Sequence, residues 1–176
     1  PHTPFTVRPP YDRMFDPAYE GWILSDRDLL AKNARERGFR AIHQEFWRIE
    51  DDAPHEIGGD MKIDPSRFSP RDIEHLKALY DGGIRYTDDT LKKFFRDLDQ
   101  EGLLDNTLVV IVSDHGEEFL EHGDFLHKRL YRETVHVPLI MFFPGRIPSG
   151  ARIARRARLL DLAPTLRDLL GLSAPE

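Results

Sequence analysis

Two short apolar runs, separated by a strongly polar loop, dominate the hydropathy pattern of this chain. Residues 108–112 (LVVIV) and 139–143 (LIMFF) have the length and the aliphatic content of β-strands. Unbroken apolar runs of this length are typical of strands that are buried on both faces of a parallel sheet. The pattern therefore predicts an α/β fold in which a mainly parallel sheet carries the polar loop at its edge.

Residues 70–98 show a different pattern, because apolar positions recur there every three or four residues. This spacing predicts an amphipathic helix, with Ser69 as its N-cap and Pro70 in its first turn. We expect it to end at Gly102, and the pair Gly82-Gly83 could bend it. The helix leads into the strand at 108–112, which is the unit expected of a helix packed on a parallel sheet.

The two ends of the chain have weaker patterns. Five prolines within residues 1–20 exclude a long helix or a central strand there, so we expect an extended loop. A short helix at residues 25–37 and an irregular insertion at residues 39–68 are expected to follow. Near the other end, Asp161 can cap a last helix, which has Pro164 in its first turn and closes at Gly171.

We therefore expect one domain with two parts. Residues 1–68 would be a Pro-rich loop and an insertion, and residues 69–176 a helix–strand–loop–strand–helix unit. Because the chain begins Pro1-His2 without a Met, it is expected to be truncated at its N-terminus.

Composition narrows the possible functions. The 176 residues are 40% hydrophobic and 32% charged, with a net charge of -6, as expected of a globular protein rather than a disordered one. The negative charge disfavours a nucleic-acid partner. Because the chain contains no Cys, it has no disulfides, thiolate metal sites or Cys nucleophile. No apolar run is long enough to span a membrane.

The polar loop after residue 112 carries most of the candidate chemistry. Ligands of open α/β sheets bind beyond the carboxyl ends of the strands, where Asp114 and His115 stand. Together they could supply an oxygen and a nitrogen to a divalent cation. His127 and Lys128, later in the loop, are donors that could hold a tetrahedral anion. Spacing alone does not separate this site from a polar loop without a ligand. Possible third metal ligands are Glu117, Glu118, Glu121, His122 and Asp124.

Other motifs are excluded or remain ambiguous. His115 and His122 are seven residues apart, so they are not the i, i+4 pair of an HExxH zinc site. Ser113-Asp114-His115 is not a catalytic triad, since neighbours on a strand point to opposite faces. A group of arginines after residue 151 could be a solvated strand edge or, alternatively, an anion-binding patch. These are Arg152, Arg155, Arg156 and Arg158.

About half of the chain resembles the C-terminal part of the sulfatase family, within the alkaline-phosphatase superfamily. The order and the spacing of several phrases agree with that family. The matching phrases are Tyr80-Asp81, Asp88, residues 105–117 (DNTLVVIVSDHGE), Glu121-His122-Gly123, residues 131–140 (YRETVHVPLI), Pro144-Gly145 and residues 161–166 (DLAPTL).

The resemblance implies roles for particular residues. Asp114 and His115 match the second pair of metal ligands, and the metal would be Ca²⁺ first, with Mn²⁺, Mg²⁺ or Zn²⁺ as alternatives. His127 falls on the position of a sulfate-binding basic residue, with Lys128 one place later, so either could act. His2, in a stretch that looks like H-x-P-[YF], would also contact the sulfate ester. His122 is a weaker candidate.

The nucleophile of the family is a formylglycine made from Cys or Ser in a C/S-x-P-x-R motif, which is expected upstream of this chain. Pro65-Ser66-Arg67 imitates the end of that motif, but Ile63 stands where the nucleophile should be. The resemblance thus implies the C-terminal portion of a sulfatase that acts on a sulfated small molecule or glycan and is inactive alone. The alternatives are a phosphatase or phosphonate monoester hydrolase of the same superfamily, and a non-catalytic binding domain. Compartment and oligomeric state stay open.

Overall fold

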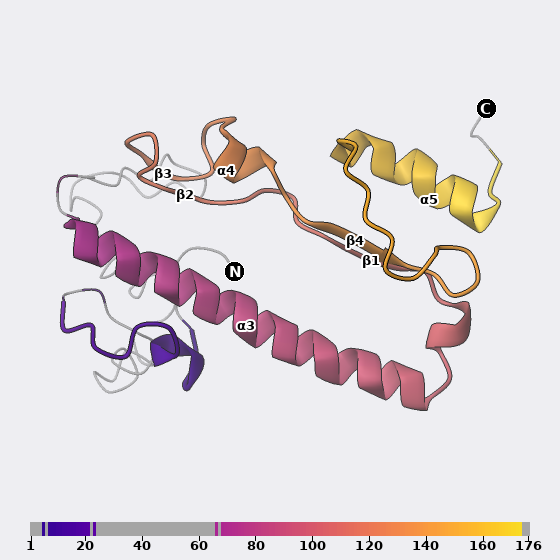
Figure 1. Cartoon of the computed structure of the whole chain (residues 1–176), viewed down its shortest axis with the longest axis horizontal. Coiled ribbons are helices and arrows are strands. Elements are labelled where there is room, and N and C mark those ends of the chain that lie inside the picture. Colours follow the sequence, from indigo (N-terminus) through magenta and orange to yellow (C-terminus); the bar gives the residue numbers. More distant parts are fainter. Residues whose placement is uncertain (1–4, 6, 22, 24–65, 67, 174–176) are drawn as a thin grey trace, which may run out of the picture.

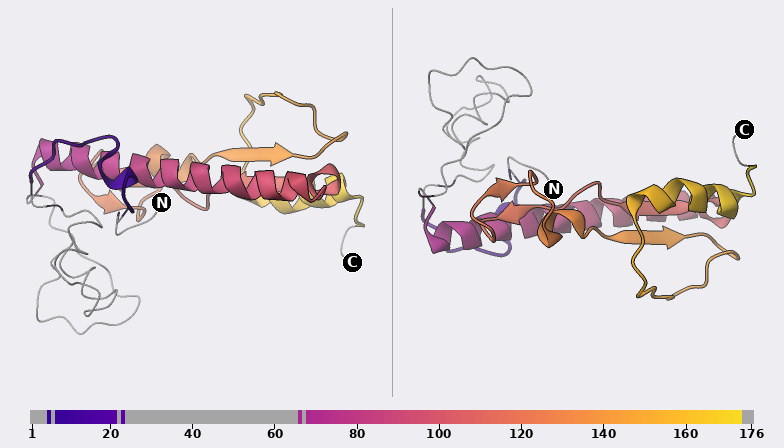
Figure 2. Two further views of the ribbon diagram at one scale, coloured as in Figure 1. Left: turned by 90° about the horizontal axis from the view of Figure 1, so that it is seen from below. Right: turned by 90° about the horizontal axis from the view of Figure 1, so that it is seen from above.

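A single long helix, α3 (Pro70–Gln100), runs along most of the molecule and organises the other elements (Figure 1). The computed structural model describes Phe5, residues 7–21, Ile23, Ser66 and residues 68–173. The N-terminal segment, with the 3-10 helix η1 (Tyr11–Arg13), lies against the first half of α3. The two strand pairs lie on the other side of α3, as the views in Figure 2 also show. The predictions for residues 25–37, for residues 39–65 and for His2 lie outside the described residues.

The start and end of α3 are confirmed. Ser69 is the N-cap, and its hydroxyl accepts a hydrogen bond from the Asp72 backbone N–H at 3.2 Å. The Asp72 carboxylate accepts one in return from the Ser69 N–H at 2.8 Å, which completes a capping box. Helix α3 continues through Gly82 and Gly83 without a break. Gly102, with φ +66°, follows the helix as its stop.

The sheets differ from the prediction. Strand β1 (Val109–Val112) pairs with β4 (Leu139–Phe142), and β2 (Glu118–Phe119) pairs with β3 (Phe125–Leu126). Both pairs are antiparallel, with Val109 opposite Phe142 in the longer one. The mainly parallel sheet is therefore not confirmed in the part of the chain that the structure describes.

The physical reason is the route of the chain. The polar loop and the short helix α4 (Arg132–Val135) turn the chain back, so that β4 runs beside β1 in the opposite direction. The two apolar runs were also expected to be buried on both faces, and this expectation is wrong. Val112, Ile140 and Phe142 are exposed, because the faces of the β1–β4 pair are only partly covered by the described residues.

The hydrophobic core lies at the other end of the molecule, between the first turns of α3 and the β2–β3 hairpin. Leu76 and Leu79 of α3 are fully buried there. Phe119 and Phe125 pack on them from the hairpin, and Phe5 packs from the N-terminal segment. This cluster fixes the β2–β3 hairpin, which lies within the polar loop. The hairpin connects the candidate residues at the start of the loop with those at its end.

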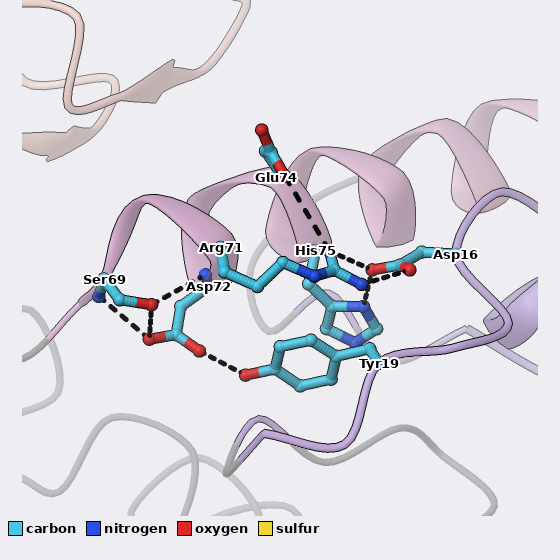
Figure 3. A network of polar contacts seen from close by, with 7 residues as sticks. All are labelled: Asp16, Tyr19, Ser69, Arg71, Asp72, Glu74 and His75. Carbon is cyan, nitrogen blue, oxygen red and sulfur yellow. Dashed lines mark hydrogen bonds and ion pairs between the residues drawn. The ribbon is translucent and has the colours of Figure 1, made fainter.

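A polar network fastens the N-terminal segment to the beginning of α3 (Figure 3). The Asp16 carboxylate accepts two hydrogen bonds from Arg71, at 2.7 and 2.5 Å, and one from His75 Nδ1 at 2.8 Å. Tyr19 stacks on the His75 ring, with 3.7 Å between centroids, and donates to Asp72. The Arg71 hydrogen bond lowers the pKa of Asp16, and burial lowers the pKa of His75.

The C-terminal elements follow the prediction in part. Helix α5 (Leu162–Leu170) ends at Gly171, whose φ of +68° confirms it as the stop. Asp161 stands at the N-cap, but its side chain does not cap α5 and instead pairs with Arg158 at 2.8 Å beside the 3-10 helix η5 (Leu159–Asp161). Residues 151–158 form exposed coil, so the strand edge expected for the arginines is not formed. Within the described ranges, no helix is both long and apolar enough to cross a bilayer.

Candidate active site

The polar loop leaves β1 at residue 113 and returns to α4 at residue 132, and two backbone hydrogen bonds close it. The Gly116 N–H donates to the Thr134 carbonyl at 2.8 Å, and the Glu117 N–H donates to the Glu133 carbonyl at 3.1 Å. A Cβ atom at residue 116 would overlap the carbonyl oxygen of Glu133. Only glycine allows this approach, which holds the first arm of the loop against α4.

Asp114 and His115 lie together on the first arm. The His115 ring donates from Nδ1 to the Gly116 carbonyl at 2.8 Å, since a carbonyl oxygen can only accept. In the neutral ring, Nε2 therefore keeps its lone pair, and it lies 3.7 Å from Asp114 Oδ1. The side chain of Asp114 is 87% exposed. The backbone N–H groups of Asp114 itself and of His115 lower the pKa of this carboxyl.

This arrangement fits a cation ligand pair. A backbone carbonyl that accepts from one ring nitrogen, while the other nitrogen keeps its lone pair, is the usual support of a metal-binding histidine. An ionised, exposed carboxylate oxygen beside this second nitrogen is another potential donor. Across residues 5–23 and 66–173, apart from the undescribed positions, no group of three or more His, Asp or Glu side chains is arranged so that it could hold a metal ion. The described residues thus bring two potential ligands together.

The five side chains considered as third ligands are engaged elsewhere. Glu118 is buried and accepts from the His122 N–H at 3.0 Å, and Glu121 pairs with Lys77 of α3 at 2.7 Å. His122 lies 3.2 Å from Glu133 and stacks on Tyr131. Asp124 lies 3.4 Å from Arg129, and Glu117 faces His127.

His127 meets His115 across the loop. The two rings stack with 3.7 Å between their centroids and 23° between their planes. The second arm reaches this position through β3, where Leu126 has a φ of +73°, a conformation that costs a non-glycine residue energy. Lys128, the neighbouring candidate, is exposed. The structure therefore brings Asp114, His115 and His127 together and leaves Lys128 at the surface.

One important neighbour was not foreseen in its present role. Glu117 was considered only as a metal ligand, yet its buried carboxylate lies 3.5 Å from His127 Nδ1. Ten residues separate the two in sequence, and no helical or strand periodicity links them. The signal that could have found the pair is the hairpin pattern, in which Phe119-Leu120 and Phe125-Leu126 flank Gly123.

Known proteins are similar to about three fifths of this chain. Arylsulfatase K of Homo sapiens is 36% identical over 110 residues, which are 62% of this chain and 20% of the relative. The Xenopus laevis protein of the same name is 34% identical over 109 residues. The chain thus spans about a fifth of the length of these curated relatives.

Solved structures are similar over nearly the whole chain. The phosphonate monoester hydrolase of Agrobacterium radiobacter has a TM-score of 0.68 and 30% identity, covering 98% of this chain and 33% of that one. The enzyme SpPMH from Silicibacter pomeroyi has a TM-score of 0.67 and 25% identity, covering 99% and 33%. The sulfatase family model matches residues 1–172. This chain belongs to the sulfatase family of the alkaline-phosphatase superfamily.

Proposed function

We propose that this chain supplies the second half of a sulfatase active site, in which Asp114 and His115 hold a divalent cation and His127 contacts the sulfate ester. The observation that carries the proposal is the His115 ring. Its Nδ1–H is fixed on the Gly116 carbonyl at 2.8 Å, and its Nε2 faces Asp114 at 3.7 Å. The cation is expected to be Ca²⁺, with Mn²⁺, Mg²⁺ or Zn²⁺ as alternatives.

The roles follow from charge and position. A bound divalent cation would neutralise charge on the sulfuryl oxygens. His127 stacks beside His115, and with its ring protonated it would donate a hydrogen bond to the same ester. This geometry favours His127 over the exposed Lys128 as the group in contact with sulfate. His2, which the family motif also assigns to the sulfate, lies outside the described residues.

Turnover needs a nucleophile as well. The chain has no Cys and no C/S-x-P-x-R sequence from which a formylglycine could be made. We therefore propose that the 176-residue chain alone does not hydrolyse an aryl sulfate. An assay with an aryl sulfate and excess Ca²⁺ should give the rate of buffer alone. A rate above that background which is lost in Asp114→Asn would contradict this part of the proposal.

The metal proposal can be tested without activity. Titration with Mn²⁺, a paramagnetic probe, should broaden the His115 ring signals in an NMR spectrum before those of His75, and Ca²⁺ should compete. Asp114→Asn should weaken this effect at least tenfold, since it replaces a charged ligand with a neutral one. The matched control is Asp124→Asn, in the same loop but paired with Arg129 at 3.4 Å. Equal broadening in both variants would refute the assignment.

A second candidate function is hydrolysis of phosphonate monoesters or phosphate esters. It is favoured by the two solved structures, both named as phosphonate monoester hydrolases. Titration of the chain with sulfate, phosphate and methylphosphonate, each with Ca²⁺, should separate the candidates through the shift of the His127 ring signals. A sulfatase site should respond to sulfate at the lowest concentration. If no oxyanion and no metal bind, a non-catalytic domain is the better description.

A further inference from the structure

We infer that Glu117 is a positioning residue, which fixes the proton of His127 on Nδ1 and so presents Nε2 of that ring to the bound ester. This inference rests on the proposed function for the meaning of Nε2, but not for the state of the ring. The geometry that carries it is a carboxylate buried behind an imidazole. Glu117 Oε1 lies 3.5 Å from His127 Nδ1, which is an ion-pair distance and not an aligned hydrogen bond, so the influence on the ring is that of a nearby buried charge.

The burial of Glu117 is the first step of the argument. Its side chain is 2% exposed, whereas the facing His127 side chain is 31% exposed. A buried carboxylate is costly unless donors or positive charge lie beside it, and an imidazole N–H provides a donor. On the side away from His127, Glu117 lies near Tyr80 of α3. Burial of Tyr80 raises the pKa of that phenol, and the charge of Glu117 raises it further. Glu117 is thus held between the helix and the ring.

The ring of His127 is fixed on two further sides. Its face stacks on His115, and its backbone follows Phe125 and Leu126, which belong to the hydrophobic core. A ring that is fixed in this way can rotate little, so a carboxylate at one edge determines which nitrogen carries the proton. The same logic orients catalytic histidines that are backed by a buried carboxylate.

The stacking also decides what Nε2 can do. A metal ion binds in the plane of an imidazole, along the nitrogen lone pair. Two rings stacked face to face, with only 23° between their planes, direct their lone pairs side by side rather than to one point. His127 is therefore not placed as a third ligand of the cation on His115. In the protonated ring, the Nε2–H group would donate to an oxygen of the substrate.

A second carboxylate–histidine pair in the same loop provides a matched control. Glu133 lies 3.2 Å from His122 Nε2, and these side chains are 33% and 37% exposed. Water competes with an exposed pair, and the His122 ring stacks on Tyr131 instead of His115. Changes at Glu133 should therefore leave His127 unaffected.

The test is the ring tautomer in the 176-residue chain, without metal or sulfate, at alkaline pH where imidazoles are neutral. Two-bond nitrogen–proton NMR correlations identify which nitrogen of His127 is protonated. In the wild-type chain, we expect a roughly tenfold excess of the Nδ1–H form, because the acceptor is buried and charged. An Nε2–H majority in the wild-type chain would overturn the inference, whatever the variants do.

Three variants complete the test. Glu117→Leu removes the acceptor with little change in size and should convert His127 to the Nε2–H form that free histidine favours. Glu117→Gln keeps a carbonyl acceptor and should retain most of the Nδ1–H form. Glu133→Leu should leave the ring of His127 unchanged. If Glu117→Leu retains the wild-type tautomer while the Phe119 and Phe125 signals show an intact core, Glu117 is only structural.

The outcome is distinguishable from failure of the proposed function. The tautomer is measured without ligands, so it is independent of any metal or oxyanion. If His127 is Nδ1–H but neither Mn²⁺ nor sulfate perturbs the loop, the function is wrong and the positioning role stands. If both ligands bind but His127 is Nε2–H, the reverse holds.

Discussion

At the scale of single residues, the candidate site depends on backbone contacts that admit only one side-chain size. Gly116 is the clearest case, because the Glu133 carbonyl occupies the space of a Cβ atom. Asp114, His115 and His127 could be proposed as candidates from the sequence, since their types and order match a known pattern. It could not find the partnership of Glu117 with His127, because a buried carboxylate and a surface one look alike in sequence.

Gly116→Ala is expected to lower the free energy of unfolding by about 1–3 kcal/mol, because the loop must move off α4 and lose hydrogen bonds. The His115 ring signals should shift as the stack on His127 opens. Urea unfolding and an NMR spectrum would measure both. As a control, Gly123→Ala meets only open space and carries the cost of a φ of +84°, about 1 kcal/mol. An unshifted His115 ring in Gly116→Ala would contradict the steric argument.

At the scale of elements, the sequence patterns predicted which helices and strands form better than they predicted in which direction the strands pair. The limits of α3 were predictable, because Ser69, Pro70 and Gly102 each act through local backbone chemistry. The pairing of β1 with β4 was not, because an apolar run has no direction and the turn through α4 lacks a strong signal. The network that joins Asp16 to Arg71 and His75 was also hidden, since 55 residues separate Asp16 from Arg71.

This network should make attachment of the N-terminal segment sensitive to acid. The folded-state pKa values of His75 and Asp16 are both lowered, so each contributes stability above its ordinary pKa that is lost as pH falls. Loss should begin below about pH 6.5, with His75, and continue below about pH 4, with Asp16. Proteolysis of the segment around Tyr19, followed against pH, would measure it.

Asp16→Asn provides the comparison for that experiment. The variant should be cut faster at neutral pH and should lose the steepest part of the pH dependence below about pH 4. Asp81→Asn, on an exposed position of α3, should behave as the wild-type chain. A wild-type cleavage rate that stays constant from neutral pH down to about pH 4 would show that the network does not fasten the segment.

At the scale of the whole molecule, the two ends differ in how well they are packed. The core surrounds the first half of α3 and supports the candidate site, whereas the β1–β4 pair exposes apolar side chains. The family and the general superfamily fold were accessible from sequence, because they depend on motifs. Which strands are buried could not be predicted from the sequence. Aliphatic content indicates which residues favour burial, but not whether another part of the protein covers them.

The exposed strand pair should cause the chain to self-associate as its concentration rises, because apolar strand surfaces pair readily. Ile140 is 58% exposed on β4, and Ile140→Lys should lower the association measured by analytical ultracentrifugation. Ile153 is 85% exposed but lies in coil, so Ile153→Lys should have a smaller effect. Equal effects of the two changes would indicate that apolar area alone, and not the strand, drives association.

The two hydrogen bonds that join the loop to residues 133 and 134 have one more consequence. Residues 116 and 117 belong to no helix or strand, and such positions ordinarily trade their amide hydrogens with water quickly. Here both N–H groups donate, at 2.8 and 3.1 Å, to carbonyls of α4. In deuterium exchange they should therefore be slowed together, as a pair, and released together when α4 unwinds.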